Sequence, residues 1–204
     1  MLKHDYAAPG IAALILAVAF PIYWLYAFHV GSENFVEIYR ADLLSLSLSD
    51  LAFVFIGVLE IYIYLSLRRS FAERLSSGSV AILLLLMALL VTIFHATVLV
   101  DVALAVTATT LSEDAINTIG EFTVMVALGM LFAYALVGLI LSIVLLLNRT
   151  GAPSVLKYFA VVLLVCCLLQ LSIILSPANI FVFPVALLLL AFYFLSAPKM
   201  LEVV

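Results

Sequence analysis

Six long apolar stretches, separated by short polar connections, constrain this chain more than any other feature. An α-helix needs about 20 apolar residues to cross the roughly 30 Å hydrocarbon core of a bilayer. In lipid, a helix also satisfies its own backbone hydrogen bonds. We therefore predict an all-α, polytopic integral membrane protein, with residues 1–204 forming a single transmembrane domain of six helices. The predicted helices cover about residues 9–30, 43–67, 79–106, 118–147, 155–175 and 180–197.

The composition excludes an ordinary soluble fold. Of the 204 residues, 68% are hydrophobic and 10% are charged, whereas globular domains are about half apolar and about a quarter charged. The first stretch is longer than the roughly 7–15 apolar residues of a signal peptide, so we expect it to remain as a spanning helix. Tyr23 and Trp24 lie toward its far end, where aromatic residues are typical of the membrane interface.

The basic residues predict the orientation of the helices. Seven of the eight Lys and Arg lie near the N-terminus, between residues 68 and 78, between residues 148 and 157, and near the C-terminus. By the positive-inside rule, this side is cytoplasmic. We therefore expect a multi-pass protein of the cell (cytoplasmic or inner) membrane with both termini cytoplasmic. The opposite side is acidic, which either attracts cations or only keeps the outer connections solvated.

Glu60 is the polar residue that most strongly indicates function. It precedes Arg68 by about 8 residues, which places it about 12 Å inside the membrane, near the midplane. Arg68 is better placed to reach the headgroups than to pair with it. A carboxyl group at this depth is costly and marks a functional site by default. We expect Glu60 to be protonated, hydrogen-bonded in a wet pocket, or occupied by a cation; the alternative is a packing face with one satisfied carboxyl.

Helical spacing predicts which residues accompany Glu60. Asp50, Gly57, Glu60 and Tyr64 recur at intervals of three, four or seven residues, so they share one face of the 43–67 helix. Tyr64 follows Glu60 by one turn and is predicted to hydrogen-bond it. Gly57 is predicted to let the backbone of another helix approach closely.

A second polar group is predicted in the outer half of the membrane. By depth, Asp50 falls between His95 and Asp101 of the 79–106 helix, so the three could form an outer access path to Glu60. His95 and Asp101 are six residues apart and therefore point about 120° apart, so they do not both face the 43–67 helix squarely. Each could instead be a hydrogen-bonded packing residue. A metal site formed by these three side chains stays open, and the identity of any metal is unknown.

Small residues in the 118–147 helix predict close helix packing. Gly129 and Ala133 form a small-xxx-small pattern, and Gly138 follows further along. Such residues let helix backbones approach in membranes, although the pattern is common by chance. Cys166 and Cys167 are adjacent in an apolar run, where we expect them to be small buried hydrophobes.

These observations leave three hypotheses for function. The first is a small transporter or channel for protons, cations or a small cationic solute, with Glu60 as the midplane site. The second is a non-transporting sensor that binds lipid or another ligand, or a partner subunit of a membrane complex. The third is an intramembrane metal-dependent hydrolase; otherwise the sequence does not indicate an enzyme. No cofactor and no nucleic acid is predicted, and the expected partners are the lipid bilayer, a proton, cation or lipid ligand, and further copies of the chain.

Overall fold

The computed structural model describes residues 6–31, 45–74, 78–107, 109–147 and 153–196. These residues are helical apart from short turns, and no strand occurs among them, as the predicted all-α fold requires. The elements are α1 (Ala7–Gly31), α3 (Leu48–Arg74), α4 (Gly78–His95), α5 (Val98–Thr107), α6 (Glu113–Leu147), α7 (Ser154–Leu171), the 3-10 helix η1 (Ser176–Ala178) and α8 (Asn179–Leu195).

Six helical segments within the described residues are long and apolar enough to cross a membrane. Helices α4 and α5 together form one of these segments, and η1 and α8 together form another. Large apolar side chains also lie exposed on the outer faces of the helices, Ile22, Leu89 and Phe181 among them. A soluble protein would bury most such surface in its core. Together these features suggest a multi-pass membrane protein and agree with the predicted number of spans.

Helix α3 begins later than predicted because a cap forms at its first turn. The prediction began at residue 43, which lies outside the described residues together with residue 44, and residues 45–47 are not helical. The Ser47 backbone N–H and hydroxyl both donate to Oδ2 of Asp50, at 2.7 and 3.2 Å. This contact is one half of a capping box, so Asp50 fixes the start of α3 at Leu48.

The predicted 79–106 helix is interrupted between α4 and α5. Residues 96 and 97 form a turn, and the Thr97 hydroxyl donates to the carbonyl oxygen of Phe94 at 2.7 Å. A side chain that donates to a backbone carbonyl oxygen in this way competes with the backbone hydrogen bonds of the helix. The apolar composition continues through the turn, which is why composition alone predicted one unbroken helix.

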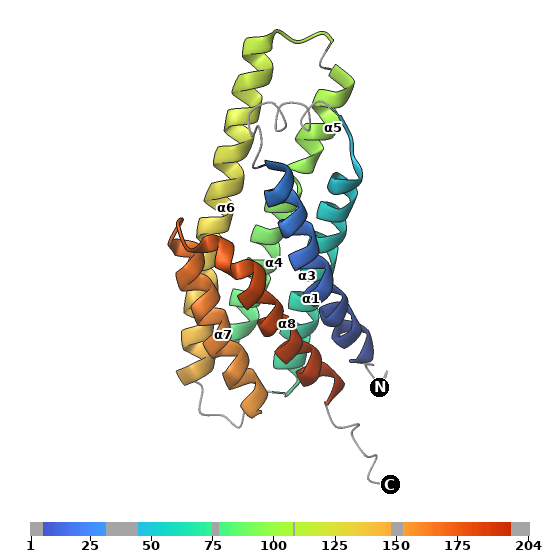
Figure 1. Ribbon diagram of the computed structural model, residues 1–204. Helices are drawn as coiled ribbons and strands as arrows, with labels where there is room; N and C mark the ends of the chain where they lie inside the picture. Colours follow the sequence, from blue (N-terminus) through green and yellow to red (C-terminus); the bar gives the residue numbers. More distant parts are fainter. Residues whose placement is uncertain (1–5, 32–44, 75–77, 108, 148–152, 197–204) are drawn as a thin grey trace.

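The six spanning segments form a ring in chain order. Each packs against the next, α1 with α3, α3 with α4, α4 with α6, α6 with α7 and α7 with α8, and α8 closes the ring on α1. Figure 1 shows α1 beginning and α8 ending at the same end of the bundle, which we call the basal end; the other is the distal end. Consecutive spans therefore lie side by side and run in opposite directions (Figure 1).

The basal half of the ring is filled by large apolar side chains. Its centre contains buried residues from five of the six spans, each at most 3% exposed, namely Phe71, Val80, Leu84, Leu141, Leu145, Leu156, Phe159, Leu190 and Phe194. A buried hydrogen bond of 2.7 Å between Ser70 and Tyr193 also crosses from α3 to α8 there. Protein interiors packed in this way leave few voids the size of a water molecule. The distal half is packed differently and contains the site.

Candidate functional site

A cavity of about 190 Å³ occupies the centre of the ring in its distal half. All six spans contribute to its walls, through residues 20–24 of α1, 53–60 of α3, 90–95 of α4, 130–135 of α6, 163–170 of α7 and 176–183 of η1 and α8. Most of the side chains that line it are apolar or aromatic. A concave, mainly apolar pocket with a few convergent polar groups is the usual form of a small-molecule site.

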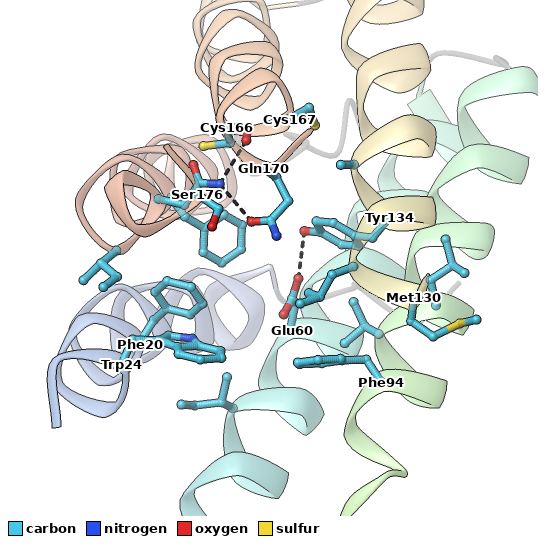
Figure 2. A pocket seen from close by; sticks show the side chains of 18 of the residues that line it. Phe20, Trp24, Glu60, Phe94, Met130, Tyr134, Cys166, Cys167, Gln170 and Ser176 are labelled. Carbon is cyan, nitrogen blue, oxygen red and sulfur yellow. Dashed lines mark hydrogen bonds between the residues drawn. The ribbon is translucent and has the colours of Figure 1, made fainter. Parts of the chain in front are cut away.

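Glu60 lies on the wall of this cavity near the middle of α3. Its side chain is only 7% exposed, and Oε1 accepts a 2.9 Å hydrogen bond from the Tyr134 hydroxyl of α6 (Figure 2). Tyr64 interacts with the same carboxyl group, and within the described residues no ion pair with Lys or Arg accompanies these contacts. The carboxyl therefore lies within the bundle without a basic partner, as the sequence predicted.

Tyr64 joins the same hydrogen-bonded group through Tyr134. The two tyrosine hydroxyls are hydrogen-bonded to each other, and Tyr134 uses its single proton on Glu60. The three side chains therefore form one hydrogen-bonded group, in which Glu60 contacts both hydroxyls. The sequence predicted the contact between Tyr64 and Glu60, which the structure contains, but it missed Tyr134. The available signal was a lone tyrosine within a long apolar helix.

His95 also lines the cavity, and Gly57 makes room for it. A Cβ atom added to Gly57 would lie 2.4 Å from Cγ of His95, so the imidazole ring packs directly on the glycine. The predicted partner of Gly57, another helix backbone, is replaced by this ring. Nδ1 of His95 is 3.0 Å from the Val91 carbonyl oxygen, and its ring centroid is 4.3 Å from that of Phe53.

Asp50 and Asp101 do not line the cavity. Asp50 caps the first turn of α3, and Asp101 belongs to α5, beyond the turn that ends α4. The predicted access path of Asp50, His95 and Asp101 therefore contributes only His95 to the walls. Within the described residues, no group of three or more His, Cys, Asp or Glu side chains is arranged to hold a metal ion.

The predicted packing residues of α6 differ in their surroundings. Gly138 is buried, and a Cβ added there would lie 2.7 Å from Sγ of Cys167 in α7. Gly129 is exposed and has no atom within 4 Å of such a Cβ, while Ala133 is half-buried. The small-xxx-small prediction therefore does not hold for Gly129 within the described part of the chain, and close packing occurs at Gly138 instead.

Aromatic rings form a continuous arc around the cavity. Phe183 of α8 lies 4.8 Å from Phe20 of α1, measured between ring centroids. The arc continues through ring pairs 6.2, 5.4, 6.0 and 5.2 Å apart, namely Phe20–Trp24, Tyr23–Trp24, Tyr23–Phe53 and Phe53–Phe94. Tyr23 and Trp24, which the sequence placed at the membrane interface, thus face the interior of the bundle.

Two amide side chains add further polar groups to the walls. Nδ2 of Asn179 donates to the Cys166 carbonyl oxygen at 3.0 Å and to Oε1 of Gln170 at 3.1 Å, which ties α8 to α7. Because the Gln170 amide oxygen accepts this hydrogen bond, the Gln170 amide nitrogen points the other way. Figure 2 shows that nitrogen directed toward Tyr134 and Glu60.

A comparison with protein-family models, curated proteins and solved structures finds nothing similar to the chain. Its function therefore has to be inferred from the geometry of the site. That geometry offers one carboxyl group, a pair of hydroxyl donors on one side of it, and an aromatic cavity on the other.

Proposed function

We propose that this protein is a small membrane transporter that uses Glu60 to carry a proton, a cation or a small cationic solute. In this proposal the chain crosses the cell membrane six times, with both termini cytoplasmic. The described basic residues at the basal end, Arg68, Arg69 and Lys157, support this orientation through the positive-inside rule. The distal half of the ring, which contains the cavity, then faces the outside.

The burial of Glu60 without a basic partner is the observation that carries the proposal. An ionised carboxylate removed from water is strongly unfavourable unless it is paired. A hydrogen bond to a charged group contributes about 1.5–3 kcal/mol, whereas burying such an ion still costs several kcal/mol after the protein has relaxed around it. A proton or a bound cation removes that penalty, and the cavity beside Glu60 gives either one a route to it.

The packing on either side of Glu60 favours a carrier over an open pore. The cavity ends at Glu60 and Tyr134, and the basal half below is filled by apolar side chains. A transported ion therefore requires the ring to rearrange so that the basal side opens, as in alternating access around a midplane site. Tyr64 follows Glu60 by one turn toward the basal end, so the hydroxyl chain points along the direction a proton would leave.

The same packing also supports a second candidate function. A cavity closed at the basal side suits a ligand-binding sensor or subunit that never transports its ligand. The two functions differ in one respect, which is whether occupancy of the Glu60 site is followed by release on the other side.

Transport by purified protein in liposomes tests the proposal. We expect wild-type protein to carry protons or a monovalent cation down an imposed gradient, measured with an internal pH-sensitive dye and a panel of cations. Glu60→Gln retains the shape of the side chain but cannot exchange a proton, so its flux should fall at least about tenfold, equivalent to about 1.4 kcal/mol. Glu121→Gln, at an exposed position of α6, is the matched control and should leave the flux unchanged.

Retained flux in a correctly folded Glu60→Gln protein would contradict the assignment of Glu60. If wild-type protein binds a cation but transports none, the binding function is supported instead.

A further inference from the structure

We propose that the cavity binds a small organic ammonium ion with a compact apolar body, whose nitrogen pairs with Glu60 and whose body lies against the aromatic arc. This inference rests on the proposed use of Glu60 as the cation site and deepens it by naming the class of ligand. Three features of the cavity support it: its size, its lining, and the arrangement of its polar groups.

The volume of the cavity sets the size of the ligand. An engineered protein cavity of about 150 Å³ holds benzene, so the 190 Å³ here accommodates a six-membered ring with one further small group. Drug-sized ligands occupy pockets of about 300–1,000 Å³ and are too large. A body of about six carbon atoms plus an amine therefore fits the space.

The lining selects against divalent metal cations. Calcium takes about 6–8 oxygen ligands, and magnesium demands near-ideal octahedral coordination. This cavity offers one carboxyl group and a few neutral polar groups among aromatic walls, and no metal-binding group is found within the described ranges. An organic ammonium needs far fewer oxygen ligands, because one carboxylate pairs with its charge and its apolar body gains from leaving water.

The polar groups converge on the place where the nitrogen would bind. An ammonium forms a charge-assisted hydrogen bond with an ionised carboxylate, so Glu60 must lose its proton as the ligand enters. The Tyr134 hydroxyl already donates to this carboxyl group, and the Gln170 amide nitrogen is directed toward the same region (Figure 2). These donors stabilise the ionised state of Glu60 that the ligand requires.

Trp24 provides a direct reporter of binding. It is the single tryptophan of the chain, and it lines the cavity. We suggest titrating the full-length protein in lipid nanodiscs at neutral pH with cyclohexylammonium, cyclohexanol and cyclohexanecarboxylate, which share one apolar body and differ in charge. Tryptophan emission is followed during each titration, and calorimetry repeats the measurement without an optical probe.

We expect cyclohexylammonium to bind at least about tenfold more tightly than cyclohexanol, and the carboxylate to bind weakest of the three. In Glu60→Gln the preference for the ammonium over the alcohol should disappear, whereas Glu121→Gln should retain it. Equal affinity for ammonium and alcohol, or no binding of either, overturns the inference. If Glu60→Gln fails to fold, the three wild-type affinities alone test the inference. If Glu60→Gln folds and still prefers the ammonium over the alcohol, the inference is overturned as well.

Different experimental results would contradict the proposed ligand class and the proposed transport function. Flux of protons or of another cation that depends on Glu60, without binding of cyclohexylammonium, overturns only the ligand class. Selective binding of cyclohexylammonium that depends on Glu60, without flux, supports the ligand class and overturns transport.

Discussion

At the scale of single residues, the site depends on one carboxyl group and two hydroxyls from different helices. Glu60 and Tyr64 are one turn apart on α3, while Tyr134 reaches them from α6. The ring geometry holds Tyr134 within hydrogen-bond distance of both. The hydroxyl pair therefore contacts the carboxyl, and in the proposed function it also offers a path for the proton of Glu60. A single substitution tests both roles.

Tyr134→Phe removes the hydroxyl but keeps the ring. We expect this variant to lose about 1–2 kcal/mol of stability, because the hydrogen bonds to Glu60 and Tyr64 are lost and both polar partners stay buried. Its transport rate should also fall at least about tenfold. Tyr193→Phe is the matched control, because it removes the buried 2.7 Å bond to Ser70 in the basal half.

Tyr193→Phe should lose about as much stability as Tyr134→Phe, measured by thermal unfolding, but should retain the transport rate of the wild-type protein. If both variants transport equally well, the hydroxyl of Tyr134 has only a structural role.

Helical periodicity predicts part of the site, and contacts between helices supply the rest. Spacing along one helix placed Glu60 and Tyr64 on one face, and depth along the next helix singled out His95. Tyr134 escaped prediction because it lies 74 residues from Glu60 in the chain, and no periodicity relates positions on separate helices. Asp50 has a suitable depth but serves as a helix cap, since it lies in the first turn of α3.

At the scale of the elements, α6 offers an internal comparison of two glycines. A methyl group on Gly138 would lie 2.7 Å from Sγ of Cys167 and 3.4 Å from Cε of Met87, whereas a methyl group on Gly129 meets nothing within 4 Å. We expect Gly138→Ala to destabilise the protein by about 1–3 kcal/mol, the usual cost of overpacking. Gly129→Ala should change stability by no more than about 0.5 kcal/mol.

Unfolding in detergent, followed by circular dichroism, measures both variants. Equal stability of the two proteins would show that α6 and α7 adjust to a methyl group between them.

The spanning segments could be predicted well, and their ends less well. Apolar length determines how many helices can cross a bilayer, so composition alone predicts six. The ends depend on individual hydrogen bonds, such as the Ser112 hydroxyl that accepts from the Ala115 N–H at 3.3 Å near the start of α6. That cap starts α6 at Glu113, five residues before the predicted start at 118. Thr97 similarly ends a helix that is apolar on both sides of the break.

At the scale of the whole molecule, the ring of spans is filled in one half and hollow in the other. Met130 and Leu141 lie on nearly the same face of α6, because 11 residues correspond to about three turns. Met130 lines the cavity, whereas Leu141 is fully buried in the basal half. The pair therefore samples both halves of the ring from one helix.

Substituting each position by cysteine tests the difference between the two halves. In a protein that carries Cys166→Ala and Cys167→Ala, we expect a small thiol reagent to modify Met130→Cys at least about tenfold faster than Leu141→Cys. Mass spectrometry of the intact protein measures both rates. Equal rates would indicate a continuous aqueous path through the ring, which favours a channel over a carrier.

The exchange of a proton for a cation at Glu60 is tested most directly by carbodiimide labelling. A small apolar carbodiimide, such as diisopropylcarbodiimide, reacts with protonated carboxyl groups and enters apolar sites. Peptide mass spectrometry should find Glu60 labelled and the exposed Glu121 unlabelled at neutral pH. A cation that binds at Glu60, as proposed, should suppress the labelling of Glu60. Labelling of Glu60 that the cation leaves unchanged, or labelling no stronger than that of Glu121, would contradict the account.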